Sequence, residues 1–273
     1  MKEILQKFFK IDRRWIFLLL AIVLFTPIIR PIGLPNKTIA RDTRNAYEAL
    51  DKLPKGSFVL FSLDYDPSTR PELQPQATAV IRHAFRRDLR VGVVTYIAGS
   101  TGLIQQIFEK VPGEFKKVNG TDYAIFPYMA NPTAVMTQMA SDFYGIYDKD
   151  QDGKDARSLP VMKGIKSYKD MAMVVNITGT SILDSWVALV GDKYNVPLVA
   201  GVTAISQPGY GPYLQTGQLK GLIGGMKGAA EYESLIQEPG KGTSGIDSLN
   251  LGHLLVLALI LTSNIILLVI RYL

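Results

Sequence analysis

Residues 58–63 read FVLFSL, and the polar sequence DYDP follows them at positions 64–67. The run is almost continuously apolar rather than alternating, which is typical of a parallel strand that is covered on both faces. Open α/β sheets bind ligands beyond the carboxyl ends of their strands. This stretch therefore predicts the first strand of an α/β domain and places a candidate site directly after it.

Four further apolar runs follow along the chain, at residues 91–97, 123–126, 171–177 and 197–204. An amphipathic helical pattern at 37–53 precedes the first run, and helix-like stretches at 71–89, 101–111, 132–147 and 180–195 separate the runs. The alternation predicts a five-stranded, mostly parallel sheet with helices on both sides. Such a three-layer sandwich resembles the generic flavodoxin-like or Rossmann-like architecture, which carries many unrelated functions.

A glycine-rich stretch, 211–236, is predicted to form the last helix of this domain, which spans residues 37–236. Its glycines recur every three or four residues and would form a stripe on one face: Gly217, Gly221, Gly224, Gly225 and Gly228. Interior glycines destabilise a helix, so a stripe indicates close approach of another backbone. The partner is either the domain's own sheet or a second subunit, unless these are loop glycines in a misassigned helix. Residues 237–248 are predicted to be a flexible tether.

Apolar segments lie near both ends of the chain, at 15–34 (interrupted only by Arg30) and at 249–270. We predict that each is a transmembrane helix, the first as an uncleaved signal anchor because no small-x-small cleavage site follows it. The positive-inside rule then places residues 1–14 and 271–273 in the cytoplasm and the central domain outside the cell membrane.

The net charge of +6 does not indicate a nucleic-acid partner, because much of the excess flanks the apolar segments. These flanking residues are Lys2, Lys7, Lys10, Arg13 and Arg14 before the first segment and Arg271 after the second. A helical face with Arg82, Arg86, Arg87 and Arg90 is interpreted as a solvated surface, or alternatively as a site for a partner or for lipid headgroups.

The chain contains no cysteine and only two histidines, His83 and His253. Disulfides, thiolate metal sites and cysteine nucleophiles are therefore excluded, and a typical catalytic zinc site is not expected. His83 is predicted to be a surface or packing residue within a helix, and His253 an interfacial residue. No G-x-G-x-x-G motif follows the first predicted strand, and the chain has no P-loop motif, so we expect no NAD or ATP use and no cofactor apart from a possible Ca²⁺.

Polar side chains gather at the predicted carboxyl ends of the strands. Asp64 and Asp66 are the candidate catalytic carboxylates. The same two residues form the candidate ligand-binding set together with Ser100, Thr101, Thr178, Thr180 and Ser181. Carboxylates and hydroxyls suit a divalent cation or a polar ligand, but these residue types are also ordinary helix caps.

The sequence DKDQDGKD at 148–155 matches the opening of a calcium-binding loop, with acidic residues at positions one, three and five and glycine at six. Position twelve is Leu159 instead of the expected glutamate. We consider a weak calcium site at Asp148, Asp150, Asp152 and Asp155, with a solvated acidic turn as the alternative.

Thr262, Ser263 and Asn264 are polar positions inside the second apolar segment. An amide in hydrocarbon usually bonds to a neighbouring helix, either in its own chain or in another subunit. We therefore expect a structural or assembly subunit of a membrane complex, which contacts lipid and associates with copies of itself or with other membrane subunits. A domain that binds a small ligand and a hydrolase that uses Asp64 and Asp66 with a metal are the alternative hypotheses.

Overall fold

The computed structural model describes residues 12–30, 32–33 and 38–272. These residues form one parallel six-stranded sheet in the order β3-β2-β1-β4-β5-β6. The strands are β1 (Phe58–Asp64), β2 (Arg90–Val94), β3 (Tyr123–Ile125), β4 (Met173–Thr178), β5 (Leu198–Val202) and β6 (Leu219–Gly224). This is the strand order of the Rossmann fold, which reverses between β1 and β4. The predicted α/β class and parallel sheet are confirmed, whereas the predicted number of five strands is wrong.

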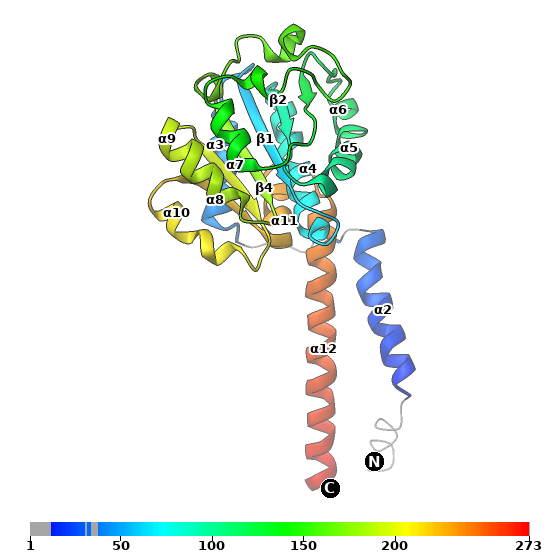
Figure 1. Ribbon diagram of the computed structural model, residues 1–273. Coiled ribbons are helices and arrows are strands. Elements are labelled where there is room, and N and C mark those ends of the chain that lie inside the picture. Colours follow the sequence, from blue (N-terminus) through cyan, green and yellow to red (C-terminus); the bar gives the residue numbers. More distant parts are fainter. Residues whose placement is uncertain (1–11, 31, 34–37, 273) are drawn as a thin grey trace.

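Helices cover both faces of the sheet (Figure 1). One layer contains α3 (Arg41–Asp51), α4 (Arg70–Arg86), α5 (Thr101–Phe108), α6 (Val111–Glu114) and α11 (Gly225–Leu235). The other layer contains α7 (Pro132–Met139), α8 (Ile182–Trp186), α9 (Asp192–Tyr194), α10 (Gly211–Gln215) and the long connection between α7 and β4. Phe61 of β1 packs on the first layer and Leu60 on the second, because successive side chains of a strand point to opposite faces.

The stretch 211–236, predicted as one helix, contains α10, strand β6 and helix α11. β6 pairs in parallel with β5, from Leu198 opposite Leu219 to Val202 opposite Gly224. The glycine spacing does reflect a close backbone contact, but that contact is made by a strand. A Cβ on Gly221 would lie 2.2 Å from the backbone nitrogen of Ala46, so α3 packs directly on the backbone of β6.

The other glycines of the predicted stripe also contact their own chain or occupy a turn. Added Cβ atoms on Gly224, Gly225 and Gly228 would meet Gln207, Ala204 and Ile223. Gly217 has a φ of +78°, in a turn before β6. The five glycines therefore do not form a stripe on a helix, and their packing inside the domain gives the predicted subunit interface no support.

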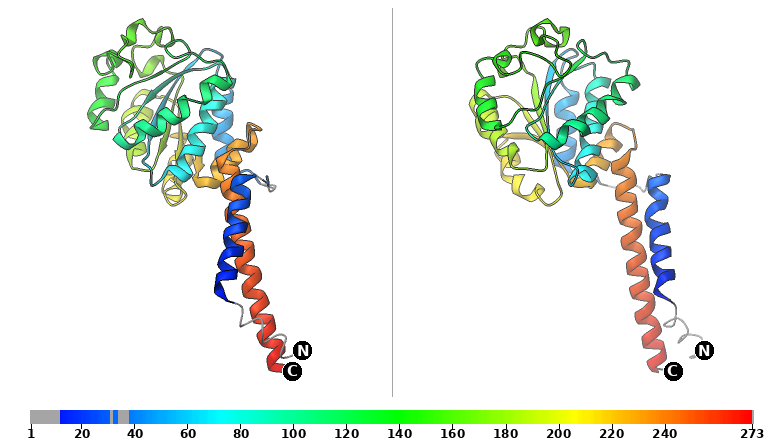
Figure 2. Two further views of the ribbon diagram at one scale, coloured as in Figure 1. Left: turned by 90° about the vertical axis from the view of Figure 1, so that its right-hand side faces the viewer. Right: turned by 45° about the vertical axis from the view of Figure 1, so that its right-hand side comes forward.

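The C-terminal helix α12 (Lys241–Tyr272) is continuous over 32 residues. At about 1.5 Å per residue it is ~48 Å long, more than the ~30 Å hydrocarbon core of a bilayer. It is the one helix among the described residues that is long and apolar enough to cross a membrane, judged by length and composition. Figures 1 and 2 show that it leaves the domain as a straight rod.

The prediction of a flexible tether at 237–248 is wrong, because α12 begins at Lys241 and its first two turns pack on the domain. Glu233 of α11, 4% exposed, accepts N–H bonds from Gly240, Gly242 and Thr243 at 2.7–2.9 Å. Gly242 permits the contact between the helices, since a Cβ there would lie 2.8 Å from the nitrogen of Ala230. Tertiary hydrogen bonds thus override the low helix propensity of this glycine- and serine-rich segment.

The N-terminal helix α2 (Arg13–Ile29) has 17 residues and is shorter than the predicted segment 15–34. It ends where Arg30 becomes extended, as expected for a residue that precedes a proline. Its length of about 25 Å is less than the ~30 Å of a hydrocarbon core, so two spanning helices are not established. Of the predicted tails 1–14 and 271–273, residues 1–11 and 273 lie outside the described residues.

α2 lies beside α12 in both views of Figure 2 and runs antiparallel to it. The hydroxyl of Ser248 donates to the carbonyl of Leu24 at 2.8 Å. Gly252 faces the same leucine, and the N–H of Gly33 donates to Asp247 at 2.8 Å. Because Leu24 lies opposite Ser248, the start of α2 at Arg13 is roughly level with position 259 of α12.

Candidate functional site

Asp64 ends β1 at the point where the strand order reverses, and its side chain is fully buried. Its carboxylate accepts bonds from the backbone N–H of Tyr96 at 2.8 Å and from the amide of Asn176 at 2.8 Å. The hydroxyls of Ser62 and Thr95 donate to it as well. Ser62 lies in β1, Asn176 lies in β4, and Thr95 and Tyr96 directly follow β2, so the carboxylate joins β1 and β4 to the end of β2.

Burial raises the pKa of Asp64 to about 6, because the ionised form loses its hydration. The hydrogen bonds from Ser62, Tyr96 and Asn176 act in the opposite direction and limit the rise. A buried acid with this pKa titrates near neutrality, but it contacts structural donors instead of a cavity. Its environment is that of a core polar network.

Asp66 lies outside the sheet and is exposed. Its carboxylate accepts the N–H of Ser68 at 2.9 Å and the hydroxyl of Ser68 at 2.6 Å, and these bonds lower its pKa. The N–H of Thr69 also donates to it, at 3.3 Å. Asp66 therefore caps the turn before α4, while Asp64 points into the core, and the two carboxylates do not form a catalytic pair.

The predicted hydroxyl ligands divide into buried and exposed groups. The Ser100 hydroxyl donates to the carbonyl of Tyr65 at 2.6 Å and accepts its N–H at 3.0 Å. The Thr178 hydroxyl donates to the carbonyl of Asp64 at 3.1 Å. These two buried hydroxyls bond to backbone, whereas Thr101, Thr180 and Ser181 are exposed. Thr101 lines a small cavity of about 160 Å³ beside Tyr128.

Side chains close the crevice between β1 and β4, where a Rossmann fold holds its ligand. The N–H of Gly179 donates to the carbonyl of Asp64 at 3.2 Å. A Cβ on Gly179 would lie 2.9 Å from the hydroxyl of Thr69, so the start of α4 packs directly against the end of β4. The absence of a glycine-rich phosphate loop in the sequence agrees with this closed arrangement.

The four aspartates of the predicted calcium loop do not converge. Asp150 is 3% exposed and accepts the N–H groups of Asp152 and Lys154 at 3.0 and 2.8 Å. Asp155 accepts the N–H of Arg157, and Asp148 is exposed. Within the described ranges, no group of three acidic or histidine side chains is placed to hold a metal ion. Calcium binding stays a prediction without structural support.

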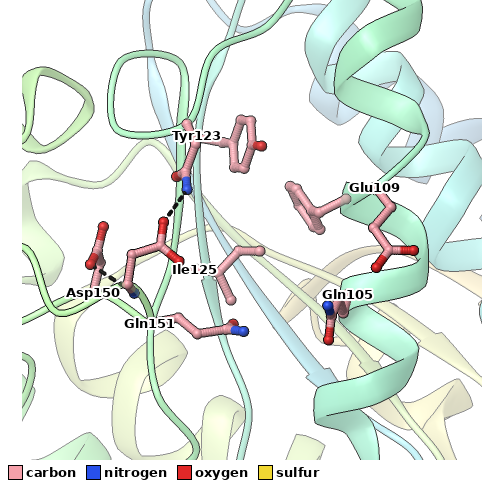
Figure 3. A pocket seen from close by; sticks show the side chains of 9 residues that line it. Gln105, Glu109, Tyr123, Ile125, Asp150 and Gln151 are labelled. Atoms are coloured by element: carbon pink, nitrogen blue, oxygen red, sulfur yellow. Dashed lines mark hydrogen bonds between the residues drawn. The ribbon is translucent and has the colours of Figure 1, made fainter.

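Asp150 also borders a shallow pocket of about 170 Å³ between β3 and α5 (Figure 3). Tyr123 and Ile125 form its strand side, and Gln105 and Glu109 form its helix side. One oxygen of Asp150 is buried without a hydrogen-bond partner. The side-chain oxygen of Asn119, another lining residue, is also buried without a partner in the described chain, while its amide nitrogen donates to Asp152 at 2.8 Å.

His83 is buried, which agrees with its prediction as a packing residue. Its ring contacts the Tyr232 hydroxyl at 2.8 Å and Asp51 at 3.1 Å, and the ring of Tyr47 stacks on it with centroids 4.4 Å apart. Burial lowers the pKa of His83. The histidine thus joins α3, α4 and α11 as a neutral packing group.

The four arginines predicted to form a solvated face are largely bound within the chain. Arg82 pairs with Glu114 through two bonds of 2.7 and 2.8 Å, and Arg86 pairs with Glu238. Arg87 lies 3.5 Å from Asp51, and Arg90 donates to the carbonyls of Gly56, Val161 and Lys163. They connect elements of the domain and leave little free charge for a partner.

Asn264 is exposed on α12, with no hydrogen-bond partner among the residues that the structure describes. Thr262 is also exposed and Ser263 is partly exposed. The three residues lie beyond the N-terminal end of α2, which is roughly level with position 259. Within the described residues, α2 therefore does not supply a hydrogen-bond partner for the side-chain amide of Asn264.

Comparison of the chain with protein-family models, with curated proteins and with solved structures gave no match.

Proposed function

We propose that this protein is a membrane-anchored assembly subunit whose α12 associates with a helix of another subunit, most simply a second copy. The observation that carries the proposal is the exposed Asn264 in the apolar part of α12. An amide in hydrocarbon that finds a partner stabilises helix association by about 0.6–2 kcal/mol. Thr262 and Ser263 are adjacent small polar residues of the kind that favours such contacts.

The joint between the domain and α12 supports the same function. A carboxylate with four hydrogen-bond donors holds the start of α12 on α11, and α12 then continues as one helix. Rotation or displacement of α12 would therefore move the whole domain. A rigid stalk of this kind suits a subunit that must present its domain at a defined orientation within a complex.

We propose further that the domain lies on the non-cytoplasmic side of the cell membrane. Arg13 and Arg14 begin α2, and Arg271 lies in the last turn of α12, so these charges lie at the membrane ends remote from the domain. In this proposal α2 and the residues around it complete a second crossing. The short α2 requires local thinning of the bilayer or snorkelling of its flanking arginines, whereas the longer α12 can tilt.

Association is tested by Asn264→Leu, with Asn250→Leu as the matched control. Asn250 is an exposed asparagine at the domain end of the same helix, where water can reach its amide. We expect Asn264→Leu to weaken association by about 3- to 30-fold, and the control to leave it unchanged. Mass measurement of the intact protein at several detergent ratios gives the oligomeric state. A monomer in native membranes, with no co-purifying subunit, would refute the proposed assembly.

Topology is tested by single cysteines, which report without background because the native chain contains none. A cysteine at the exposed position Lys163 should react with a membrane-impermeant maleimide in sealed cells. A cysteine at Tyr272 should react only after lysis. The reverse labelling pattern would overturn the proposed orientation and leave the association proposal standing.

A further inference from the structure

A groove of about 540 Å³ lies where the domain meets the membrane helices. It is lined by α4, α5 and α6, by the start of α12, and by Ile28 in the last turn of α2. Figure 1 shows α5 and α6 above the domain-side end of α2. Its volume is within the range of about 300–1,000 Å³ that is usual for ligand sites.

The groove has an excess of positive charge that the chain does not neutralise. Among the described residues, the guanidinium of Arg70 bonds only to the neutral amide of Gln106, at 2.8 Å. The ammonium groups of Lys110 and Lys241 are exposed and form no ion pair with any described residue. Among the carboxylates of the groove, only Glu114 forms an ion pair with a described residue, so Glu109 and Glu233 oppose these three cations.

Two carboxylates of the groove are already engaged. Glu114 is paired with Arg82, and Glu233 accepts the N–H groups at the start of α12. Glu233 also excludes an anion from that helix start, so a ligand must be bound by side chains. With four cations against three carboxylates, the lining carries a net charge of +1, which complements an anionic group.

The position and lining of the groove favour a lipid over a free anion. Ile28, which is 56% exposed, adds apolar surface that inorganic phosphate would not use and that the glycerol and upper acyl chain of a phospholipid would cover, and the buried Ile107 and Val111 lie at the base of the groove. Because Ile28 belongs to α2, a lipid beside that helix reaches the groove without leaving the bilayer.

We propose that this groove binds the headgroup of an anionic phospholipid in the leaflet adjacent to the domain. Arg70, Lys110 and Lys241 would bind the phosphate, and the apolar residues would cover the carbon atoms next to it. The site would fix the height and tilt of the domain over the membrane. This inference rests on the proposed membrane insertion, but it does not depend on subunit association.

The test uses the full-length protein in detergent, titrated with phosphatidylglycerol, phosphatidylcholine or inorganic phosphate and followed by native mass measurement. We expect one phosphatidylglycerol to bind in preference to phosphatidylcholine. Each basic residue near an anionic lipid contributes about fivefold to the affinity, from ~1 kcal/mol per charge. Replacing Arg70, Lys110 and Lys241 together by glutamine should therefore weaken binding by tenfold or more.

The matched control replaces three exposed lysines that do not line the groove, Lys154, Lys163 and Lys166, by glutamine. It removes the same net charge and should retain the lipid. Glu109→Gln should tighten binding about fivefold, which keeps the test informative even if the triple variant fails to fold. The proposal would be overturned if both triple variants lost lipid affinity equally. It would also be overturned if inorganic phosphate saturated the site and the protein showed no preference between the two lipids.

The same spectra separate this proposal from subunit association. The groove variant should keep the oligomeric mass, and Asn264→Leu should keep the lipid. Failure of the chain to remain with membranes after alkaline washing would reject membrane insertion itself.

Discussion

Replacing Glu233 by alanine tests the joint between α11 and α12, on which the rigid orientation of the domain depends. The substitution removes one buried acceptor that serves the N–H groups of Gly240, Gly242 and Thr243 and the hydroxyl of Thr243. Water can reach Gly240 and Thr243, which are half-buried, but Gly242 is buried and its N–H would lose its partner.

The size of the effect follows from these contacts. Loss of a helix cap costs about 0.5–2 kcal/mol, and a buried donor without a partner costs about 1–3 kcal/mol more. We therefore expect the free energy needed to open the first turn of α12 to fall by roughly 2–4 kcal/mol. The equilibrium constant for opening would then rise by a factor of about 30 to 1,000.

Hydrogen exchange followed by mass spectrometry measures this opening at the amides of residues 240–244. Glu231→Gln is the control, because Glu231 is also buried on the same helix but its carboxylate accepts from Lys227 at 2.7 Å and from no described N–H group of α12. The control should leave exchange at 240–244 unchanged. Exchange in Glu233→Ala within threefold of the wild-type rate would refute the view that this carboxylate holds the stalk.

Two further predictions concern the domain. The pKa of Asp64 is about 6 in the folded protein, compared with 3.8 for an aspartate in water, so the folded state binds more protons between these values and the free energy of unfolding should rise as the pH falls from 7 to 4.5. Over this pH interval Asp64 should contribute about 2 of the roughly 3 kcal/mol that full protonation gives, and thermal unfolding should show this contribution in the wild type and not in Asp64→Asn. An equal pH response in both proteins would contradict the assignment. Gly221→Ala should lower the free energy of unfolding of the domain by about 1–3 kcal/mol, because its Cβ would overlap the backbone of Ala46. If the variant were instead as stable as the wild type but had become monomeric, the glycine would belong to a subunit interface.

The sequence alone predicted the strands and helices whose hydrophobic pattern is contained in a few neighbouring residues. The continuous apolar runs predicted strands β1 to β5, since strands buried on both faces need apolar side chains at every position. The uncharged stretch at 249–270 predicted the membrane-competent part of α12 for a similar reason. The short seventeen-residue α2 shows the limit of this approach, because an apolar composition does not set where a helix ends.

Contacts between residues far apart in the chain decided the rest. Residues 219–224 form a strand in spite of their helical glycine spacing, because β6 pairs with β5 and Gly221 packs against Ala46 of α3. The sequence placed Asp64 and Asp66 together at a strand end, but only the packed sheet made one a core residue and the other a cap. The hydrogen bonds of Glu233 likewise stabilise a helix start in the segment predicted to be a flexible tether. The groove at the membrane end of the domain is formed by four separate helices and the end of α2. The periodicity of a sequence indicates which side chains of a segment are buried. It does not indicate which distant segment covers them, and the strand β6, the core position of Asp64, the start of α12 and the groove all depend on that.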